Sequence, residues 1–297
     1  MTEATPAVAA TKAAPGETTT PAGRYWGRVA AVYAEMRPPL RPSAEDIRFF
    51  GQTAAAYVLR HPLETNQALL LGVTPDIAAM PWPPSFSLLG IDQSSEMVKS
   101  VWPGDVPGER WAVNGNWLSL PKRPSSCDIV IGDGSMNCLR YPDDQRYFAR
   151  SVRNVLKPDG IFILRCFTQS EQQELPDRVL EEAMRGEIPT FTQFRFRLLM
   201  AMQPSTGEGI AVSAVYRFWI SHRPEESLLL SRTGWPKSDI DHIEVYRDGA
   251  AVHVFPTLAE CRATLSEFFD EISVSFPSYY AGDRCPRLVL RPRRSGG

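Results

Sequence analysis

The sequence predicts an α/β protein built on a doubly wound, mostly parallel sheet, and three observations support this fold class. Short, largely apolar runs recur along the chain, as expected of strands buried on both faces. They are "ALLLGV" (68–73), "FSLLGID" (86–92), "RWAVNGNW" (110–117), "CDIVIGD" (127–133) and "IFILRCF" (161–167). Helical patterns or loops separate these runs, and two strand-like runs joined by a Gly-Asp loop close the chain at 272–292. We therefore expect seven strands, of which the last two form an antiparallel hairpin.

Composition is consistent with this fold and narrows the function. The 297 residues are 43% hydrophobic and 22% charged, which is typical of a soluble globular protein. A net charge of -2 gives no electrostatic reason to expect nucleic acid or an anionic membrane as a partner. The five cysteines are scattered without a C-x-x-C pair, which favours a reducing compartment over disulfides or structural zinc. With no signal sequence or membrane-spanning run, we expect a cytoplasmic protein that binds no metal.

The chain begins with a segment of low complexity that precedes two helices. Residues 1–22 are rich in Ala, Thr, Pro and Gly, and we expect a disordered tail. Residues 23–65 form an N-terminal helical unit, interrupted by a proline pair. Its second helix has Ser43 at the N-cap and Asp46 at the capping-box position.

The rest of the chain divides into three parts. Residues 66–170 carry the five parallel strands, and their helix "YPDDQRYFARSVRNVLKPDG" is expected to stop at Pro158 and Gly160. Residues 171–255 interrupt the alternation as a helical insertion of about 85 residues. Residues 256–297 return to the sheet with one helix and the hairpin.

Ligands of parallel sheets bind at the carboxyl ends of the strands, so the loop after the first strand is informative. A pyrophosphate loop needs several glycines, but this turn has only Gly72. Thr74 is suited to the N-cap of the next helix, Pro75 to its first position, and Asp76 to its first turn. Asp76 would complement the helix dipole and repel an anion, so the turn favours a cationic ligand.

A carboxylate after the second strand completes this argument. Asp92 lies about 20 residues beyond Gly72, where an acid binds ribose hydroxyls in nucleotide-binding sheets. The alternative is a simple helix cap for "DQSSEM". An adenosine without pyrophosphate, joined to a cation, describes S-adenosylmethionine.

Residues 66–168 resemble the core of the class I, Rossmann-like S-adenosylmethionine-dependent methyltransferases. The resemblance rests on "LLLGVTPD", "LLGIDQS", "VNGNWLSLP", "CDIVIGDGSMN" and "VRNVLKPDGIFILR". The final helix and hairpin fit the last strands of that family, whereas the insertion has no counterpart. The chain departs from the family in having Leu70 and Leu71 where an acid is usual, and Asn116 where another acid contacts adenine. An amide can still accept a hydrogen bond from the adenine amine.

The resemblance implies contacts to the methionine end of the cofactor. Gly72, Val73 and Thr74 would approach the methionine moiety, and Asp133 and Gly134 would lie beside the sulfonium. For Asp133 the alternative is a cap for the following "GSMN" turn.

The same resemblance implies the adenosine contacts. Asp92 would bind the ribose, Gln93 and Met97 would flank adenine, and Asn116 and Trp117 would frame the base. Trp117 is equally well explained as a core aromatic.

Three aromatic residues of the N-terminal unit resemble the lid that closes over the cofactor in small-molecule members. They are Tyr25, Trp26 and Tyr33, and the alternative is an amphipathic helix that packs its aromatic side chains on the sheet. Arg41, after the proline break, is expected at the surface, with a carboxylate contact as the alternative.

Methyl transfer needs in-line positioning and exclusion of water, and a base only when the acceptor carries a proton. The candidates for that base are Asp133 and His242, along with His222 and His253, although each histidine is better explained by a surface or core role.

The sequence also bears on the acceptor. Residues 133–136 lack the (N/D)-P-P-(Y/F) tetrad of the members that methylate adenine or glutamine amino groups. The insertion interleaves Arg195 and Arg197 with phenylalanines, which suits an acidic aromatic substrate or stacked RNA bases; the alternative is helix packing with the arginines in solvent.

We therefore expect a methyltransferase that acts on a small molecule. A non-catalytic cofactor-binding or regulatory protein and an RNA methyltransferase are the alternatives. The acceptor atom and the oligomeric state stay open.

Overall fold

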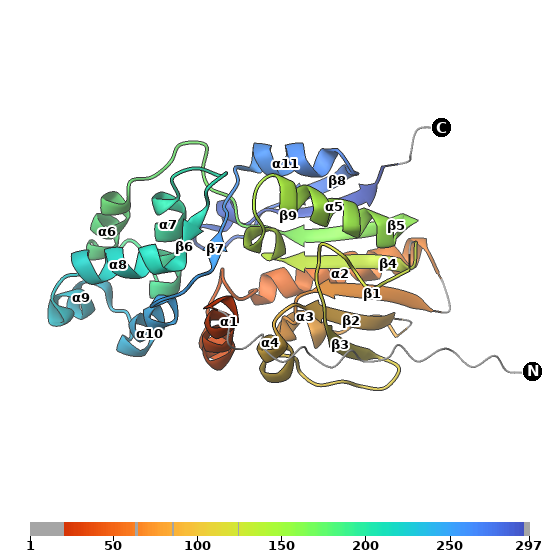
Figure 1. The fold of residues 1–297 in the computed structure, drawn as a ribbon, viewed down its shortest axis with the longest axis horizontal. Helices are drawn as coiled ribbons and strands as arrows, with labels where there is room; N and C mark the ends of the chain where they lie inside the picture. The colour runs from red at the N-terminus through yellow and green to blue at the C-terminus, as the bar shows by residue number, and fades with distance from the viewer. Residues whose placement is uncertain (1–20, 63–64, 85, 124, 294–297) are drawn as a thin grey trace, which may run out of the picture.

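A computed structural model describes residues 21–62, 65–84, 86–123 and 125–293. Most of the segment expected to be a disordered tail, residues 1–20, lies outside this range, and helix α1 already begins at Pro21. Seven strands form one sheet in the order β3-β2-β1-β4-β5-β9-β8 (Figure 1). They are β1 (Asn66–Leu71), β2 (Phe86–Asp92), β3 (Arg110–Asn114), β4 (Cys127–Asp133), β5 (Leu156–Arg165), β8 (Phe269–Ser275) and β9 (Arg287–Pro292). β1 to β5 pair in parallel, whereas β9 is antiparallel to both β5 and β8, which confirms the predicted fold class.

The centre of the sheet is buried on both faces, as its apolar runs predicted. Leu69 and Leu71 of β1 pack with α5 and α11 on one face, and Leu70 packs with α2 on the other. Leu71 is in register with Ile91 of β2 and Gly132 of β4. The strand ends that lead to Asp92 and Asp133 therefore flank the end of β1.

Helices cover both faces of the sheet. They are α2 (Ala44–Arg60), α3 (Pro75–Ala78), α4 (Ser95–Ser100), α5 (Asp143–Val155) and α11 (Leu258–Ser266). The capping box at the start of α2 is formed by Ser43 and Asp46, as predicted. The predicted end of α5 is wrong, because the helix stops at Val155 and Leu156 already pairs with Cys127 as part of β5. Strand pairing thus takes over before the proline is reached.

The insertion folds into helices beside the sheet. Its elements are α6 (Pro176–Met184), α7 (Phe191–Met202), α8 (Val212–His222), α9 (Glu226–Thr233), α10 (Lys237–Asp241) and a small ladder of β6 (Ile210–Ala211) with β7 (Val252–His253). In Figure 1 these elements gather to the left of the sheet, and α1 (Pro21–Val32, red) lies between them and α4. α1 thus bridges the two parts of the molecule.

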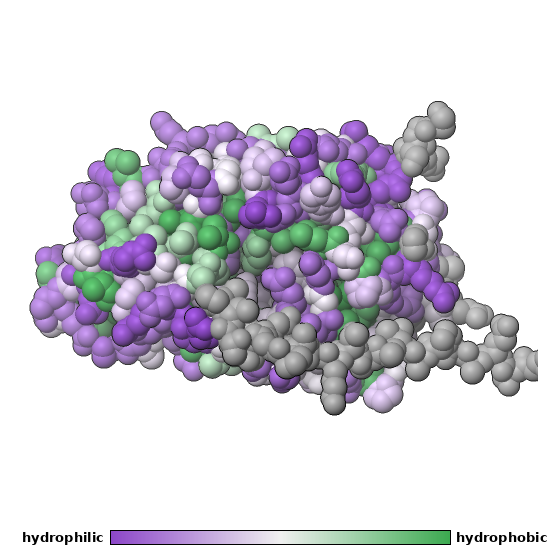
Figure 2. All heavy atoms as spheres, in the orientation of Figure 1, coloured by the Kyte–Doolittle hydropathy of each residue, from purple (hydrophilic) through white to green (hydrophobic). Residues whose placement is uncertain are grey.

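α7 is the central helix of the insertion. Its Phe191 and Phe194 pack on Trp219 and Trp235. Hydrophobic residues surface as a green band across the middle of the face in Figure 2, bordered by hydrophilic ones. Within the part of the chain that the structure describes, no helix is both long and apolar enough to cross a bilayer.

We expected the two arginines of α7 to lie in solvent, and this expectation is wrong. Arg197 is buried and held by Glu174, Glu182 and Tyr280. Arg195 is also buried, and it faces the cavity described below. Both arginines lie in the middle of α7, and because this helix is packed against other residues on all sides, neither side chain reaches solvent.

Candidate active site

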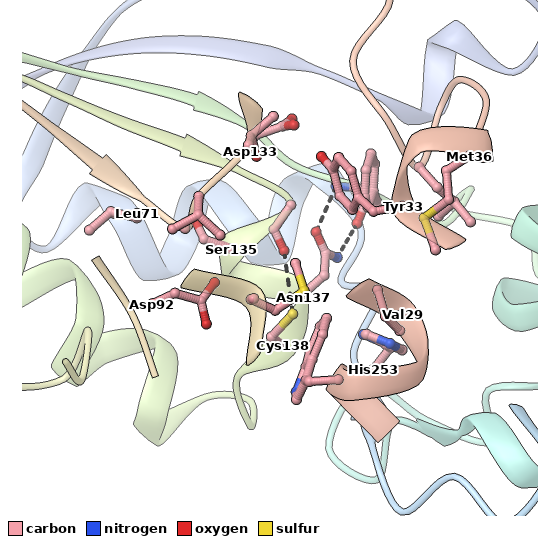
Figure 3. Close-up of a pocket in the computed structure, with 18 of the residues that line it drawn as sticks. Val29, Tyr33, Met36, Leu71, Asp92, Asp133, Ser135, Asn137, Cys138 and His253 are labelled. Atoms are coloured by element: carbon pink, nitrogen blue, oxygen red, sulfur yellow. Dashed lines mark hydrogen bonds between the residues drawn. The ribbon is translucent and has the colours of Figure 1, made fainter. Parts of the chain in front are cut away.

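A cavity of about 150 Å³ lies where the carboxyl ends of β1, β2 and β4 meet the insertion (Figure 3). One wall comes from the strand ends and their loops. The opposite wall comes from α1, α7 and the segment that leads into β7. Typical ligand sites hold roughly 300–1,000 Å³, so this cavity is smaller than such sites.

The strand-end wall contains the residues that the sequence pointed to most directly. Gly72 follows β1 with φ of +118°, a conformation that favours glycine, and its N–H donates to the Ile91 carbonyl at 2.7 Å. A Cβ on Gly72 would lie 4.0 Å from the Asp92 carboxylate, so the turn and Asp92 face one another. Gly134, at φ +64°, leaves room for Phe167, because a Cβ there would be 2.9 Å from that ring. Val73 and Thr74 complete this part of the wall.

Asp133 lines the cavity, but its carboxylate already has a partner. The Nε of Arg165, at the end of β5, donates to Asp133 Oδ1 at 2.5 Å. Burial raises the pKa of Asp133 more than the positive charge of Arg165 lowers it. The cap interpretation is wrong, because the 3₁₀ turn Ser135–Cys138 starts at Gly134 with no side-chain cap. Contact with the cofactor stays a prediction for Asp133. The carboxylate that would make this contact is already paired with Arg165.

The turn after β1 differs from its predicted electrostatics. Asp76 accepts two hydrogen bonds from Arg41, at 2.8 and 2.9 Å, so its charge is balanced by a neighbouring segment. Arg41 is therefore a half-buried ion-pair partner, and the surface position expected for it is wrong. Thr74 occupies the N-cap of α3 without a side-chain cap bond, and instead hydrogen-bonds Tyr33. These contacts tie the segment after α1 to the turn.

Of the four residues expected around adenine, two line the cavity. Met97 and Trp117 do so, while Gln93 and Asn116 are exposed and lie outside the lining. The side-chain oxygen of Asn116 accepts from the backbone N–H of Leu118, which shapes its own loop. Trp117 donates from Nε1 to the Ile91 carbonyl at 2.7 Å and packs edge-on against Phe148. It is thus both a core aromatic and part of the wall.

The aromatic residues of the N-terminal unit cover the cavity. Tyr25, Trp26 and Tyr33 all line it, together with Val29 and Met36. Burial raises the pKa of both Tyr25 and Tyr33 well above the ordinary value for tyrosine. Their position fits a lid, and that role stays a prediction.

One histidine reaches the cavity, and it is not the one favoured from the sequence. His253 of β7 has its Nε2 3.2 Å from the Tyr25 hydroxyl and also hydrogen-bonds the backbone of Asn137. Burial lowers the pKa of His253 to about 4, and the bond to Asn137 only partly opposes this. His242 lies outside the lining, paired with Glu35 at 2.9 Å, and His222 is exposed. Only the β6–β7 ladder brings His253 inward, and no sequence motif marks it.

A wider depression of about 720 Å³ lies at the opposite edge of the sheet. Tyr57, His61, Asp159 and Arg293 are among its lining residues. It sits near the amino ends of the parallel strands, where this kind of sheet does not bind its ligands. The cavity at the carboxyl ends is therefore the candidate active site.

Fold and site together define an α/β protein with a carboxylate after β2 and a cavity at the carboxyl ends of its parallel strands. Residues 71–164, which run from the end of β1 into β5, match the family model of a methyltransferase domain. This match supports a class I S-adenosylmethionine-dependent methyltransferase, with S-adenosylmethionine as its cofactor. The search of curated proteins found no match.

Solved structures resemble the chain in fold at low sequence identity. A Rhodobacter sphaeroides protein described as a candidate Zn-dependent alcohol dehydrogenase has a TM-score of 0.61 at 13% identity, covering 93% of this chain and 100% of its own. A chain from the Haloferax volcanii complex of the Trm112 methyltransferase activator with a methyltransferase has a TM-score of 0.50 at 13% identity, covering 93% and 99%. Within the described residues, no three His, Cys, Asp or Glu side chains are grouped to hold a metal ion.

Proposed function

We propose that this methyltransferase acts on a small molecule enclosed between the strand ends and the insertion. The observation that supports this proposal is a single cavity whose lining includes Gly72 and Asp92 on one side and Arg195 and Tyr246 on the other. A donor bound at the strand ends would thus face an acceptor bound against the insertion. The cavity is bounded on its outer side by α1 and the insertion, and this arrangement favours a compact acceptor over a polymer.

The strand-end wall fits S-adenosylmethionine. Asp92 offers carboxylate oxygens to the ribose hydroxyls, and Gly72 lets the backbone approach the methionine part closely. Met97 and Trp117 offer apolar surface to adenine. When bound, the cofactor supplies a methyl group already activated by its sulfonium. The protein is left to orient the acceptor and to exclude water.

The cavity of about 150 Å³ is smaller than typical ligand sites, so entry of both ligands requires it to widen. The segment after α1 is held down by the Arg41–Asp76 ion pair and by the Tyr33–Thr74 hydrogen bond, both of which join the turn after β1. Arg28, Glu35 and Arg37 add contacts to the insertion, and because most of these contacts are partly exposed, each can break at modest cost. We propose that α1 and its aromatic residues move as the lid, and that they exclude water once the ligands are bound.

His253 is placed to take the proton of an O–H or N–H acceptor. Because its pKa is about 4, the imidazole is neutral near pH 7, and its Nε2 faces the cavity beside Tyr25. In this proposal the acceptor proton passes to Nε2 while the acceptor gains the methyl group. Tyr25 then hydrogen-bonds to the acceptor oxygen or nitrogen and holds it toward the strand ends.

The test begins with titration calorimetry of S-adenosylmethionine and S-adenosylhomocysteine. Wild-type protein should bind both, while Gly72→Val should bind them at least 10-fold more weakly, because a β-branched side chain is strained at φ +118°. A Gly104→Val variant is the matched control, since Gly104 also has positive φ but lies away from the cavity. Failure of both ligands to bind would contradict the proposal.

Turnover separates the remaining alternatives. The protein is incubated with methyl-labelled cofactor and either a pool of small metabolites or total RNA. Label in a low-mass product supports the proposal. Label in RNA favours an RNA methyltransferase, and binding without turnover on either substrate pool favours a non-catalytic protein.

A further inference from the structure

We infer that Arg195 binds an anionic group of the acceptor, so that the substrate is a small planar acid with a carboxylate. This inference rests on the proposed function, because it assigns the chemical class of the molecule that fills the insertion side of the cavity. It starts from the unusual surroundings of one buried charge.

Arg195 is 1% exposed, yet its guanidinium is poorly satisfied. Nη1 donates to the His242 carbonyl at 3.1 Å, and the group stacks 4.8 Å from the centre of the Tyr246 ring. Nε has no hydrogen-bond partner, and no described carboxylate lies within ion-pairing distance of the side chain. A charge withdrawn from water without an anion costs several kcal/mol.

The other buried arginines of this fold have their charge balanced by carboxylates. Arg165 pairs with Asp133, Arg197 with Glu174 and Glu182, and Arg287 with Glu45. Among the arginines classed as buried in the described chain, Arg195 alone lacks a carboxylate. It is also the only one of the four that lines the cavity. The missing anion is therefore expected to come from the ligand.

The charges around the cavity give the acceptor an orientation. Both carboxylates of the described lining, Asp92 and the Arg165-paired Asp133, lie at the strand ends, whereas Arg195 is the sole Arg or Lys of that lining and stands on the insertion side. A cationic donor and an anionic acceptor would thus be drawn to opposite walls.

Aromatic side chains connect Arg195 to the proposed proton acceptor. Arg195 stacks on Tyr246, the Tyr246 ring lies 6.4 Å from that of Tyr25, and the Tyr25 hydroxyl is 3.2 Å from His253 Nε2. A planar ring lying along these side chains could place its carboxylate on Arg195 and its hydroxyl or amine near His253. An aromatic acid with a second, methylatable group has this shape.

The experiment compares matched acids and neutral amides. Dissociation constants are measured for a panel of small aromatic carboxylates, including 4-hydroxybenzoate and salicylate, and for the corresponding amides, at fixed ionic strength and with saturating S-adenosylhomocysteine. Wild-type protein should bind at least one acid 10-fold or more tightly than its amide. Arg195→Met should abolish that preference, and Arg195→Lys should retain part of it because it keeps the charge.

Two controls keep the result interpretable. Arg217→Met removes an exposed arginine of α8 and should leave the preference intact. S-adenosylhomocysteine should bind Arg195→Met within about 2-fold of wild type, which shows that the site is folded. Equal binding of acids and amides by wild type, no binding of any acid, or a preference that survives in Arg195→Met would overturn the inference.

The two proposals can fail separately. If S-adenosylhomocysteine does not bind wild-type protein, the proposed function fails. The acids and amides are then compared without it, and the preference and its loss in Arg195→Met still decide whether Arg195 binds an anion.

Discussion

Two buried arginines stand on opposite sides of the cavity, and they differ in what surrounds them. Arg165, at the end of β5, contacts the Asp133 and Asp46 carboxylates, the Tyr279 hydroxyl and the Pro39 carbonyl. Arg195, in α7, has one carbonyl and one aromatic ring. Both are at most 1% exposed. The first charge is paired with carboxylates of the fold and holds several segments together, although its Nη2 has no hydrogen-bond partner. The second charge has no carboxylate among the described residues and is left for something outside the chain.

The largest expected change in stability comes from removing Arg165, the arginine that is paired with carboxylates. Arg165→Met leaves Asp133 and Asp46 buried without their common partner, and it should lower the free energy of unfolding by about 3–5 kcal/mol. Urea denaturation measures this change. Arg140→Met is the control, since Arg140 pairs with Asp144 on the surface and should change stability far less than Arg165→Met does. A loss below about 1 kcal/mol for Arg165→Met would show that the network is not coupled to folding.

The next effect concerns His253, on the same side as Arg195. Its pKa is about 4 in the folded protein against an ordinary value of 6.5, so unfolding takes up a proton once the pH falls below about 6.5. The stability due to the neutral ring is complete above pH 6.5 and is lost progressively toward pH 4. Between pH 7.5 and pH 4.5 this loss amounts to roughly 2–3 kcal/mol.

His253→Asn removes the titrating ring, so its free energy of unfolding should fall less steeply with acid than that of wild type. Tyr25→Phe is the control, because it keeps the imidazole and loses only the hydroxyl that contacts Nε2. The measurement is urea denaturation at a series of pH values. Equal slopes for wild type and His253→Asn would mean that the imidazole is not held neutral by the fold.

A smaller effect tests the cofactor end. Asp92→Asn keeps the shape of the side chain and removes its charge, and it should weaken S-adenosylhomocysteine binding by about 10- to 100-fold, or roughly 1.4–2.7 kcal/mol. Gln93→Ala should change the affinity less than about 3-fold, because Gln93 is exposed and outside the cavity lining. Calorimetry compares the two variants. A larger loss for Gln93→Ala would restore its predicted place beside adenine.

The two sides of the cavity also differ in how far the sequence foretold them. The sheet and the residues at its strand ends could be predicted, because apolar runs report burial directly and parallel strands bring their carboxyl ends to one edge. Gly72, Asp92 and Gly134 were found in this way and do line one cavity. Their neighbours Gln93 and Asn116 are exposed and lie outside the lining, since a family position does not specify how a loop turns its side chains, and contact with adenine stays a prediction for both.

For the insertion side, the sequence predicted the helices but not which side chains contact one another. The pattern of α7 showed phenylalanines alternating with arginines, yet whether those arginines meet carboxylates depends on residues far along the chain. Arg197 meets Glu174 and Tyr280, and Arg195 meets the backbone of His242. His253 likewise reaches the cavity only through the pairing of β7 with β6. Long-range contacts of this kind produce no local sequence pattern, so they could not be predicted.

The smallest expected change in stability is the most informative about the contrast between the two arginines. Arg195→Met replaces a buried charge by an apolar side chain that can follow much the same path, and no carboxylate is left unpaired in the described structure. The free energy of unfolding should therefore stay within about 1 kcal/mol of wild type or rise. A loss of about 3 kcal/mol or more, like that expected of Arg165→Met, would show that the His242 carbonyl and the Tyr246 ring already satisfy the charge.

A carboxylate ligand sharpens the distinction between the two arginines, because a compound that binds only the folded protein stabilises it in proportion to the logarithm of the compound's concentration. The acid preferred by wild type should raise the midpoint of wild-type unfolding and leave that of Arg195→Met unchanged, whereas S-adenosylhomocysteine should raise both.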